Sequence, residues 1–127
     1  MAHAFASHST ELPLARLEEM RAHGGPAQTV GLTDTVIGEF LEDDRQLALA
    51  IERAYAHFLE LKSSHADFLA LAEVDQIVQA QEGLTNFYAQ DVVNPYVAAG
   101  AAGPWVVSLK GAVIYDCGGY GMLGLGH

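Results

Sequence analysis

The sequence predicts a mainly helical chain that ends in a β-hairpin, an α+β fold. Apolar side chains recur at spacings of three and four across residues 11–81, which is typical of helices with one buried face. Near the C-terminus, Trp105-Val106-Val107 and Val113-Ile114-Tyr115 flank a Lys110-Gly111 turn, which indicates a hairpin. The length of 127 residues suits a single hydrophobic core. We therefore expect a helical segment over residues 1–91, followed by a linker, the hairpin and a glycine-rich loop over 92–127.

The first helix is expected over residues 11–22. Ser9 or Thr10 can cap its free amides, and Pro13 is tolerated in a first turn. Leu14, Leu17 and Met20 form its apolar face, and Gly24-Gly25-Pro26 ends it.

Two more helices are expected next. The second follows Thr33, and its apolar face consists of Val36, Ile37, Phe40 and Leu41. The cluster Glu42-Asp43-Asp44 interrupts the helical pattern and places negative charge at the start of a third helix over residues 45–62. The apolar stripe of that third helix comprises Leu47, Ile51, Tyr55, Phe58 and Leu59.

A fourth helix is expected over residues 65–81, because Ser64-His65-Ala66-Asp67 resembles a capping box. Gly83 would close it, and residues 84–90 could add one or two turns. Asn94-Pro95 marks the change to extended chain. Residues 98–103, a run of Ala and Gly, read as a small-residue linker.

Charge and composition limit the classes of function. Six Lys and Arg against 16 Asp and Glu give a formal net charge of −10, which disfavours a nucleic-acid partner. The N-terminus lacks the pattern of a secretory signal, and no apolar run is long enough for a membrane span. The single cysteine, Cys117, excludes an internal disulfide and suits a reducing compartment. The expectation is a cytoplasmic protein with no membrane association.

The charges are unevenly distributed. Only Lys110 and Asp116 carry charge after Asp91, so the last third of the chain is almost bare of it. Because an isolated hairpin is marginal in water, either the helices cover both of its faces or it packs against protein outside this chain. The second arrangement is the one we expect.

No set of side chains forms a recognisable metal or catalytic centre. The six histidines never occur four residues apart on one helix face with a third ligand nearby. The cluster at residues 42–44 lacks the alternating ligands and glycine of a calcium loop, and Cys117 has no neighbouring cation. Gly118-Gly119-Tyr120-Gly121 does not match the dinucleotide fingerprint. We expect no metal-binding or catalytic residue in the chain.

A family resemblance is carried by the C-terminal residues. The residues that carry it are Gly103, Gly111, Tyr115, Asp116, the loop 118–125 with five glycines over 118–126, and Gly126-His127. This pattern resembles the N-terminal segment of class III aminotransferases, pyridoxal-phosphate enzymes of the ornithine, acetylornithine and 4-aminobutyrate aminotransferase type. Two features depart from it: the family usually has Asp before the turn, where this chain has Ser108, and the proline that follows Gly-His would lie beyond His127.

The resemblance implies a fold-type-I pyridoxal-phosphate enzyme, a homodimer that moves an amino group between an amine or ω-amino acid and a 2-oxo acid. It also implies that Gly119, Tyr120, Gly121 and Met122 line a substrate pocket near the dimer interface. The cofactor lysine lies far downstream in the family, and neither Lys62 nor Lys110 is in a similar context. We therefore expect this chain to be an N-terminal fragment that is inactive and binds no cofactor without the remainder of the enzyme and a second subunit.

Two alternatives from other classes stay open. One is a non-enzymatic, acidic helical interaction module whose apolar tail docks into a partner. The other is a carrier of a small ligand with an apolar pocket between its helices. A reading frame that continues past His127 would favour the aminotransferase, and a native stop codon there would favour the module.

Overall fold

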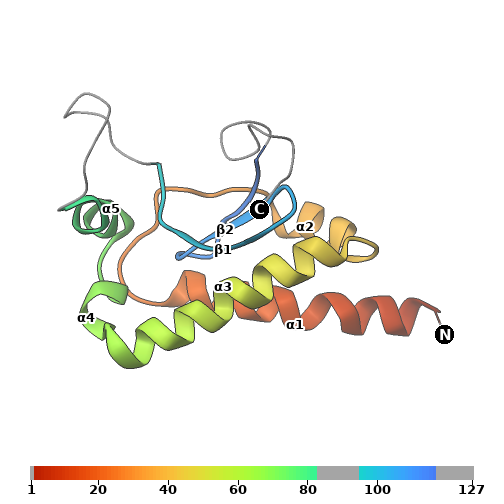
Figure 1. The fold of residues 1–127 in the computed structure, drawn as a ribbon. Helices are drawn as coiled ribbons and strands as arrows, with labels where there is room; N and C mark the ends of the chain where they lie inside the picture. Colours follow the sequence, from red (N-terminus) through yellow and green to blue (C-terminus); the bar gives the residue numbers. More distant parts are fainter. Residues whose placement is uncertain (1, 83–94, 117–127) are drawn as a thin grey trace.

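The computed structural model describes residues 2–82 and 95–116, and the side chains from Thr10 onward within them (Figure 1). In this part of the chain the elements are, in order, α1 (Ala2–Ala22), α2 (Asp34–Leu41), α3 (Arg45–Ser64), α4 (Ala66–Leu69), α5 (Glu73–Gln81), β1 (Ala98–Ala102), β2 (Trp105–Ser108) and β3 (Val113–Tyr115). Helices and an antiparallel sheet together confirm the α+β class. The glycine-rich loop lies outside the described residues.

The molecule has a helical layer and a sheet layer. In Figure 1, α1 and α3 run in roughly the same direction beneath the sheet, with α2 at one end and α4 and α5 at the other. One apolar core joins the layers, and its buried members include Leu17 of α1, Ile51 and Phe58 of α3, and Trp105 and Val107 of β2. The helices and the hairpin therefore share a single core.

The predicted second helix, after Thr33, and the predicted third helix, after the acidic cluster 42–44, are confirmed. The Thr33 hydroxyl accepts a hydrogen bond from the Val36 amide at the start of α2. The Asp44 carboxylate accepts from the Gln46 and Leu47 amides at the start of α3. Asp44 also accepts a 2.9 Å bond from the Trp105 indole N–H, so one side chain caps a helix and anchors the sheet to it.

The first helix is longer than predicted. Helix α1 begins at Ala2, so Pro13 lies inside it and not in a first turn, and the predicted cap at Ser9 or Thr10 is wrong. Leu17 and Met20 are fully buried as predicted. The helix ends at Ala22, just before Gly24, whose φ of +75° is the left-handed conformation common after helices.

The predicted fourth helix is two helices. The Ser64–Asp67 capping box is wrong, because α4 begins at Ala66 and its N-cap residue, His65, makes no side-chain cap hydrogen bond. The chain then leaves the helical path at 70–72, where the loop after α1 presses against it. There the Gly25 amide donates to the Ala70 oxygen, and the Glu73 amide donates to the Pro26 oxygen, each at 2.9 Å. These tertiary bonds replace helix bonds, which is why the periodic pattern did not reveal the break.

The small-residue segment at 98–103 is a strand and not a linker. Strand β1 pairs with β2 in an antiparallel ladder, with Ala101 opposite Val106 and an irregularity between Ala98 and Gly100. It packs closely on α3, where the Gly100 backbone lies against Ala50 and Ala54. Larger side chains would hold the strand away from the helix, so the Ala-Gly composition reflects this close approach.

The predicted hairpin is confirmed and forms part of a three-stranded sheet of order β1-β2-β3. Trp105 lies opposite Tyr115, and Val107 lies opposite Val113. The expectation that protein outside this chain covers the hairpin is wrong for β2, whose Trp105, Val106 and Val107 are already buried here. Tyr115 at the end of β3 is half exposed.

Candidate functional site

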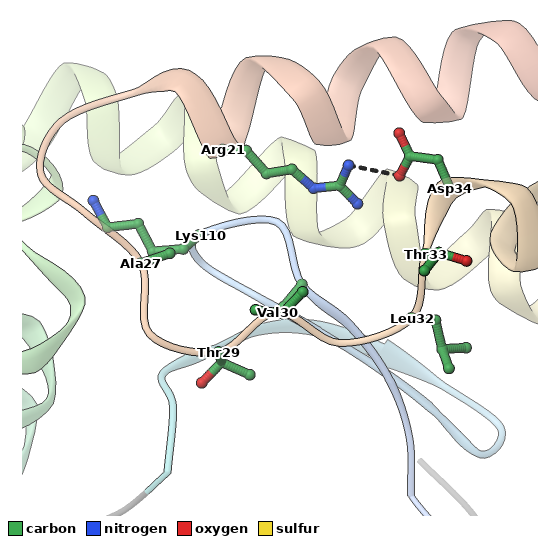
Figure 2. A pocket seen from close by; sticks show the side chains of 9 residues that line it. Arg21, Ala27, Thr29, Val30, Leu32, Thr33, Asp34 and Lys110 are labelled. Atoms are coloured by element: carbon green, nitrogen blue, oxygen red, sulfur yellow. Dashed lines mark hydrogen bonds and ion pairs between the residues drawn. The ribbon is translucent and has the colours of Figure 1, made fainter.

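The described residues enclose a partly open cavity of about 330 Å³ between the end of α1, the loop before α2 and the β2–β3 turn (Figure 2). Four of its lining residues are apolar: Ala27, Val30, Leu32 and Ala112. The polar lining residues are Arg21, Thr29, Thr33, Asp34 and Lys110. Two of the six Lys and Arg residues of the chain, Arg21 and Lys110, are among the lining residues.

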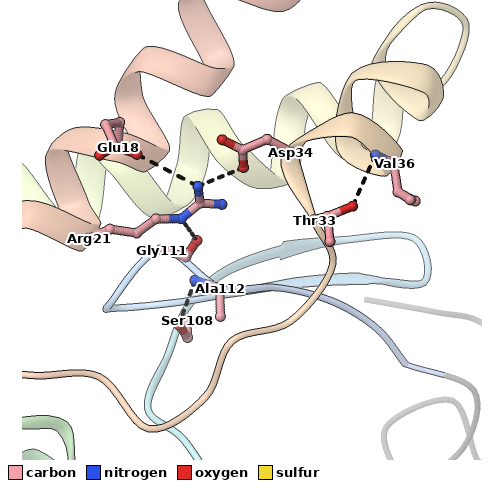
Figure 3. Close-up of polar contacts among 8 residues, drawn as sticks. All are labelled: Glu18, Arg21, Thr33, Asp34, Val36, Ser108, Gly111 and Ala112. Atoms are coloured by element: carbon pink, nitrogen blue, oxygen red, sulfur yellow. Dashed lines mark hydrogen bonds and ion pairs between the residues drawn. The ribbon is translucent and has the colours of Figure 1, made fainter.

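Arg21 links all three walls of the cavity. Its Nε donates to the Gly111 oxygen in the β2–β3 turn at 2.9 Å, and its Nη1 lies 2.6 Å from Asp34 Oδ1 at the start of α2 (Figure 3). A longer ion pair of 3.9 Å joins it to Glu18 on α1. The guanidinium thus holds the turn and α2 against the last turn of α1.

Lys110 is a buried lysine, with 3% of its surface exposed. Its ammonium donates to the main-chain oxygens of His23 at 3.3 Å and of Gly25 at 3.1 Å. In Figure 2 this ammonium points away from the Arg21–Asp34 pair, so the aliphatic stem of Lys110 is what faces the cavity. Burial lowers the pKa of Lys110 below its usual 10.5, and the negative charge of Glu73 partly opposes that shift.

Glu73 at the start of α5 holds the loop from its other side. Its carboxylate accepts from the Thr29 amide at 2.9 Å and from the Gln28 amide at 3.3 Å, and the side chain is buried. On the hairpin side, the Leu32 amide donates to the Val113 oxygen at 2.9 Å. The loop 23–33 is therefore bonded both to the helical corner and to the sheet, and the cavity beneath it is preformed.

We expect the burial of Lys110 to give a measurable pH dependence of stability. Between its lowered folded pKa and 10.5, the folded protein binds fewer protons at this site than the unfolded chain does. The contribution of Lys110 to the free energy of unfolding should therefore rise with pH across that window. Urea unfolding of the wild type and of Lys110→Met at several alkaline pH values should show this rise only in the wild type. A Lys62→Met control should keep it, and parallel pH profiles for wild type and Lys110→Met would contradict it.

The predicted substrate-binding residues Gly119, Tyr120, Gly121 and Met122 lie outside the described residues, as does Cys117. Within residues 2–82 and 95–116, no three His, Cys, Asp or Glu side chains gather in a way that could hold a metal ion. No helix in the same ranges is long and apolar enough to cross a membrane.

Sequence reasoning missed the roles of the buried residues Glu73 and Lys110 and of the partly exposed Arg21. One signal was available for Lys110: it is the only cation after Asp91, in an otherwise apolar stretch. A lone charge in such a stretch is either exposed on a turn or buried with partners, and the sequence pattern does not distinguish the two. Arg21 and Glu73 gave no signal, because both look like ordinary charges on a helix.

Comparison with known proteins adds no relative: no protein-family model, curated protein or solved structure matches this chain.

Proposed function

We propose that this chain is the N-terminal segment of a class III pyridoxal-phosphate-dependent aminotransferase. The reaction would move an amino group between an amine or ω-amino acid and a 2-oxo acid. The observation that carries the proposal is the conformation of the two turn glycines in the motif, Gly103 and Gly111. They have φ values of +57° and +79°, a region that residues with a side chain rarely adopt. The motif's glycines thus lie at the two turns of the three-stranded sheet, where the main chain has a left-handed conformation.

The space around these glycines supports the same proposal. A Cβ at Gly111 would lie 2.8 Å from the Leu17 main-chain oxygen, and a Cβ at Gly103 would collide with the Gln46 side chain. The left-handed conformation selects glycine at both turns, and the main chain of α1 adds a packing reason at Gly111.

Ser108, which replaces the family's usual Asp, is also compatible with the motif. Its hydroxyl accepts a 3.0 Å hydrogen bond from the Ala112 amide across the β2–β3 turn. An aspartate carboxylate at this position could accept the same bond, since Asp, Asn and Ser side chains all stabilise turns in this way. Ser108 in place of Asp therefore still provides a side-chain oxygen that accepts the hydrogen bond of the turn.

The two lysines of the chain do not fit the cofactor. Lys62 on α3 is exposed and lies over the Phe58 ring, and Lys110 is committed to two main-chain oxygens beneath a loop. The lysine that would hold pyridoxal phosphate is therefore proposed to lie outside this chain, and no chemical step is assigned to the residues described. The remainder of the enzyme and a second subunit are the proposed partners.

The alternative of an interaction module with an apolar docking tail is less well supported. In the described part of that tail, Trp105, Val107 and Val113 belong to the chain's own core and not to an exposed apolar surface. The aminotransferase proposal consequently rests on the motif and on its turn geometry, not on an uncovered hairpin.

The test is to purify the protein made from the complete reading frame with pyridoxal phosphate and to fix any lysine-bound cofactor with borohydride. Peptide mass spectrometry should then place the label on a lysine outside residues 1–127, and the residue 1–127 chain treated alike should carry none. The complete protein should also transfer an amino group from an ω-amino acid to a 2-oxo acid. A complete protein that takes up no label, or a label on Lys62 or Lys110, would refute the proposal.

A further inference from the structure

We propose that the cavity beneath the loop 23–33 binds a free α-amino acid with an aliphatic side chain. The proposal concerns residues of α1, this loop and the β2–β3 turn, and it does not depend on the proposed aminotransferase reaction. Three properties of the cavity lead to it: its size, its apolar floor, and the pair of opposite charges at one end.

Size restricts the ligand to a small molecule. A volume of about 330 Å³ is at the lower end of known ligand pockets, which range over about 300–1,000 Å³. An amino acid fits in such a space, whereas a folded peptide does not. The wall is also held in place without a ligand, by the bonds of Arg21 to Gly111, of Leu32 to Val113 and of Glu73 to Thr29, so binding needs little ordering.

The apolar part of the wall suits an aliphatic side chain. Ala27, Leu32, Ala112 and the stem of Lys110 line it, and Val30 at 79% exposure leaves most of an aliphatic side chain in water. Covering such surface is favourable by about 25 cal/mol per Å². A ligand with a branched apolar group would gain this favourable free energy of burial, and a purely polar ligand would not.

The charged end of the wall suits a zwitterion. Arg21 uses Nε on Gly111 and Nη1 on Asp34, and in Figure 2 its other terminal nitrogen is turned toward the side of the cavity where Val30 and Leu32 lie. The half-exposed Asp34 carboxylate has acceptor capacity beyond the one bond to Arg21.

Ligands of a single charge fit this end less well. A simple carboxylic acid would bring a second carboxylate next to Asp34, and a simple amine would bring a cation next to Arg21. An α-amino acid places its carboxylate at Arg21 and its ammonium at Asp34, so both signs are matched. It also carries no net charge toward a chain of formal charge −10, which repels free anions.

The experiment compares three probes on the residue 1–127 chain by isothermal titration calorimetry and amide chemical shifts. The probes are L-leucine, 4-methylpentanoate, which lacks the ammonium, and 3-methylbutylamine, which lacks the carboxylate. Leucine should bind saturably and at least about tenfold more tightly than either analogue, the effect of losing one ion pair of about 1.4 kcal/mol. Shifts should centre on Arg21, Leu32 and Ala112. Equal binding of all three probes, or no saturable binding of leucine, would overturn the proposal.

Two variants and one matched control test where the ligand binds. Val30→Asp places a carboxylate at the mouth of the cavity on a side chain that is mostly exposed, and it should abolish leucine binding. The matched control Val74→Asp changes an exposed valine on α5 that does not line the cavity, and it should bind leucine as the wild type does. In Asp34→Asn, the preference for leucine over 4-methylpentanoate should fall about tenfold. Leucine binding that survives Val30→Asp would place the ligand elsewhere and sink the proposal.

Discussion

Gly100→Ala is expected to destabilise the protein by about 3 kcal/mol, although it adds a single methyl group. The added Cβ would lie 2.8 Å from Ala54 Cα and 2.9 Å from the Ala50 oxygen, and it would also collide with the Ala54 amide nitrogen. All three atoms belong to the α3 backbone, which cannot turn aside as a flexible side chain would. Strand β1 must therefore move away from α3, and the change should be seen as a lower urea midpoint followed by Trp105 fluorescence.

Gly38→Ala is the matched control, because it makes the same change inside α2 where a Cβ meets no atom within 4 Å. Replacing glycine by alanine in a helix usually stabilises a protein by about 0.4–1 kcal/mol. The two substitutions should therefore shift the midpoint in opposite directions. A loss at Gly100 no larger than about 0.5 kcal/mol would show that β1 is not pressed against α3 as described.

Asp44→Ala should cost about 3 kcal/mol, because it removes two roles at once. The Asp44 Oδ1 caps α3 through the Gln46 and Leu47 amides, and loss of such a cap typically costs about 1 kcal/mol. The Oδ2 accepts the indole N–H of Trp105, which is fully buried. An unpaired buried donor costs about 1–3 kcal/mol more. Urea unfolding followed by circular dichroism measures the sum.

A second background separates the two roles of Asp44. In Trp105→Phe the indole donor is absent, so Asp44→Ala should there cost only the cap, about 1 kcal/mol. Asp44→Ser in the wild-type background should keep the cap and lose the indole bond. If Asp44→Ala costs the same with Trp105 as with Phe, the bond between α3 and β2 contributes nothing to stability.

The parts of the fold that the sequence predicted are those set by local chemistry. Helix α2 follows Thr33 and α3 follows the acidic cluster that ends at Asp44, as predicted. The predicted glycines Gly24, after α1, and Gly111, in the hairpin turn, both have the left-handed conformation. Each depends on a few adjacent residues, so the pattern of residue types is sufficient to find it.

The wrong predictions concern features decided by distant contacts. Strand β1 has no β-branched or aromatic residue, and it is a strand because it pairs with β2 and lies against Ala50 and Ala54. The break between α4 and α5 exists because the loop near Gly25 bonds to Ala70 there. Secondary-structure propensity and hydrophobic periodicity are properties of one segment, and they contain no information on its contacts with distant segments.

The cavity could not be predicted for the same reason. Asp34 lies 13 residues after Arg21, and Lys110 lies 76 residues after Asp34. Only folding brings the three residues together to line one cavity. Sequence alone placed the functional interest in Gly119, Tyr120, Gly121 and Met122, which lie outside the described residues and stay a prediction.

The shared core has a consequence for synthesis on the ribosome. Helices α1 to α5 emerge first, but the core they build is completed by Trp105, Val107 and Val113, which are translated after them. At about 5–20 residues per second, Leu47, Ile51 and Phe58 must wait some seconds for the strands that cover them. During that interval the apolar faces of the nascent helices are exposed, and chaperones bind surfaces of this kind. A slowly translated stretch after α5 would lengthen this exposure and lower the yield of folded protein.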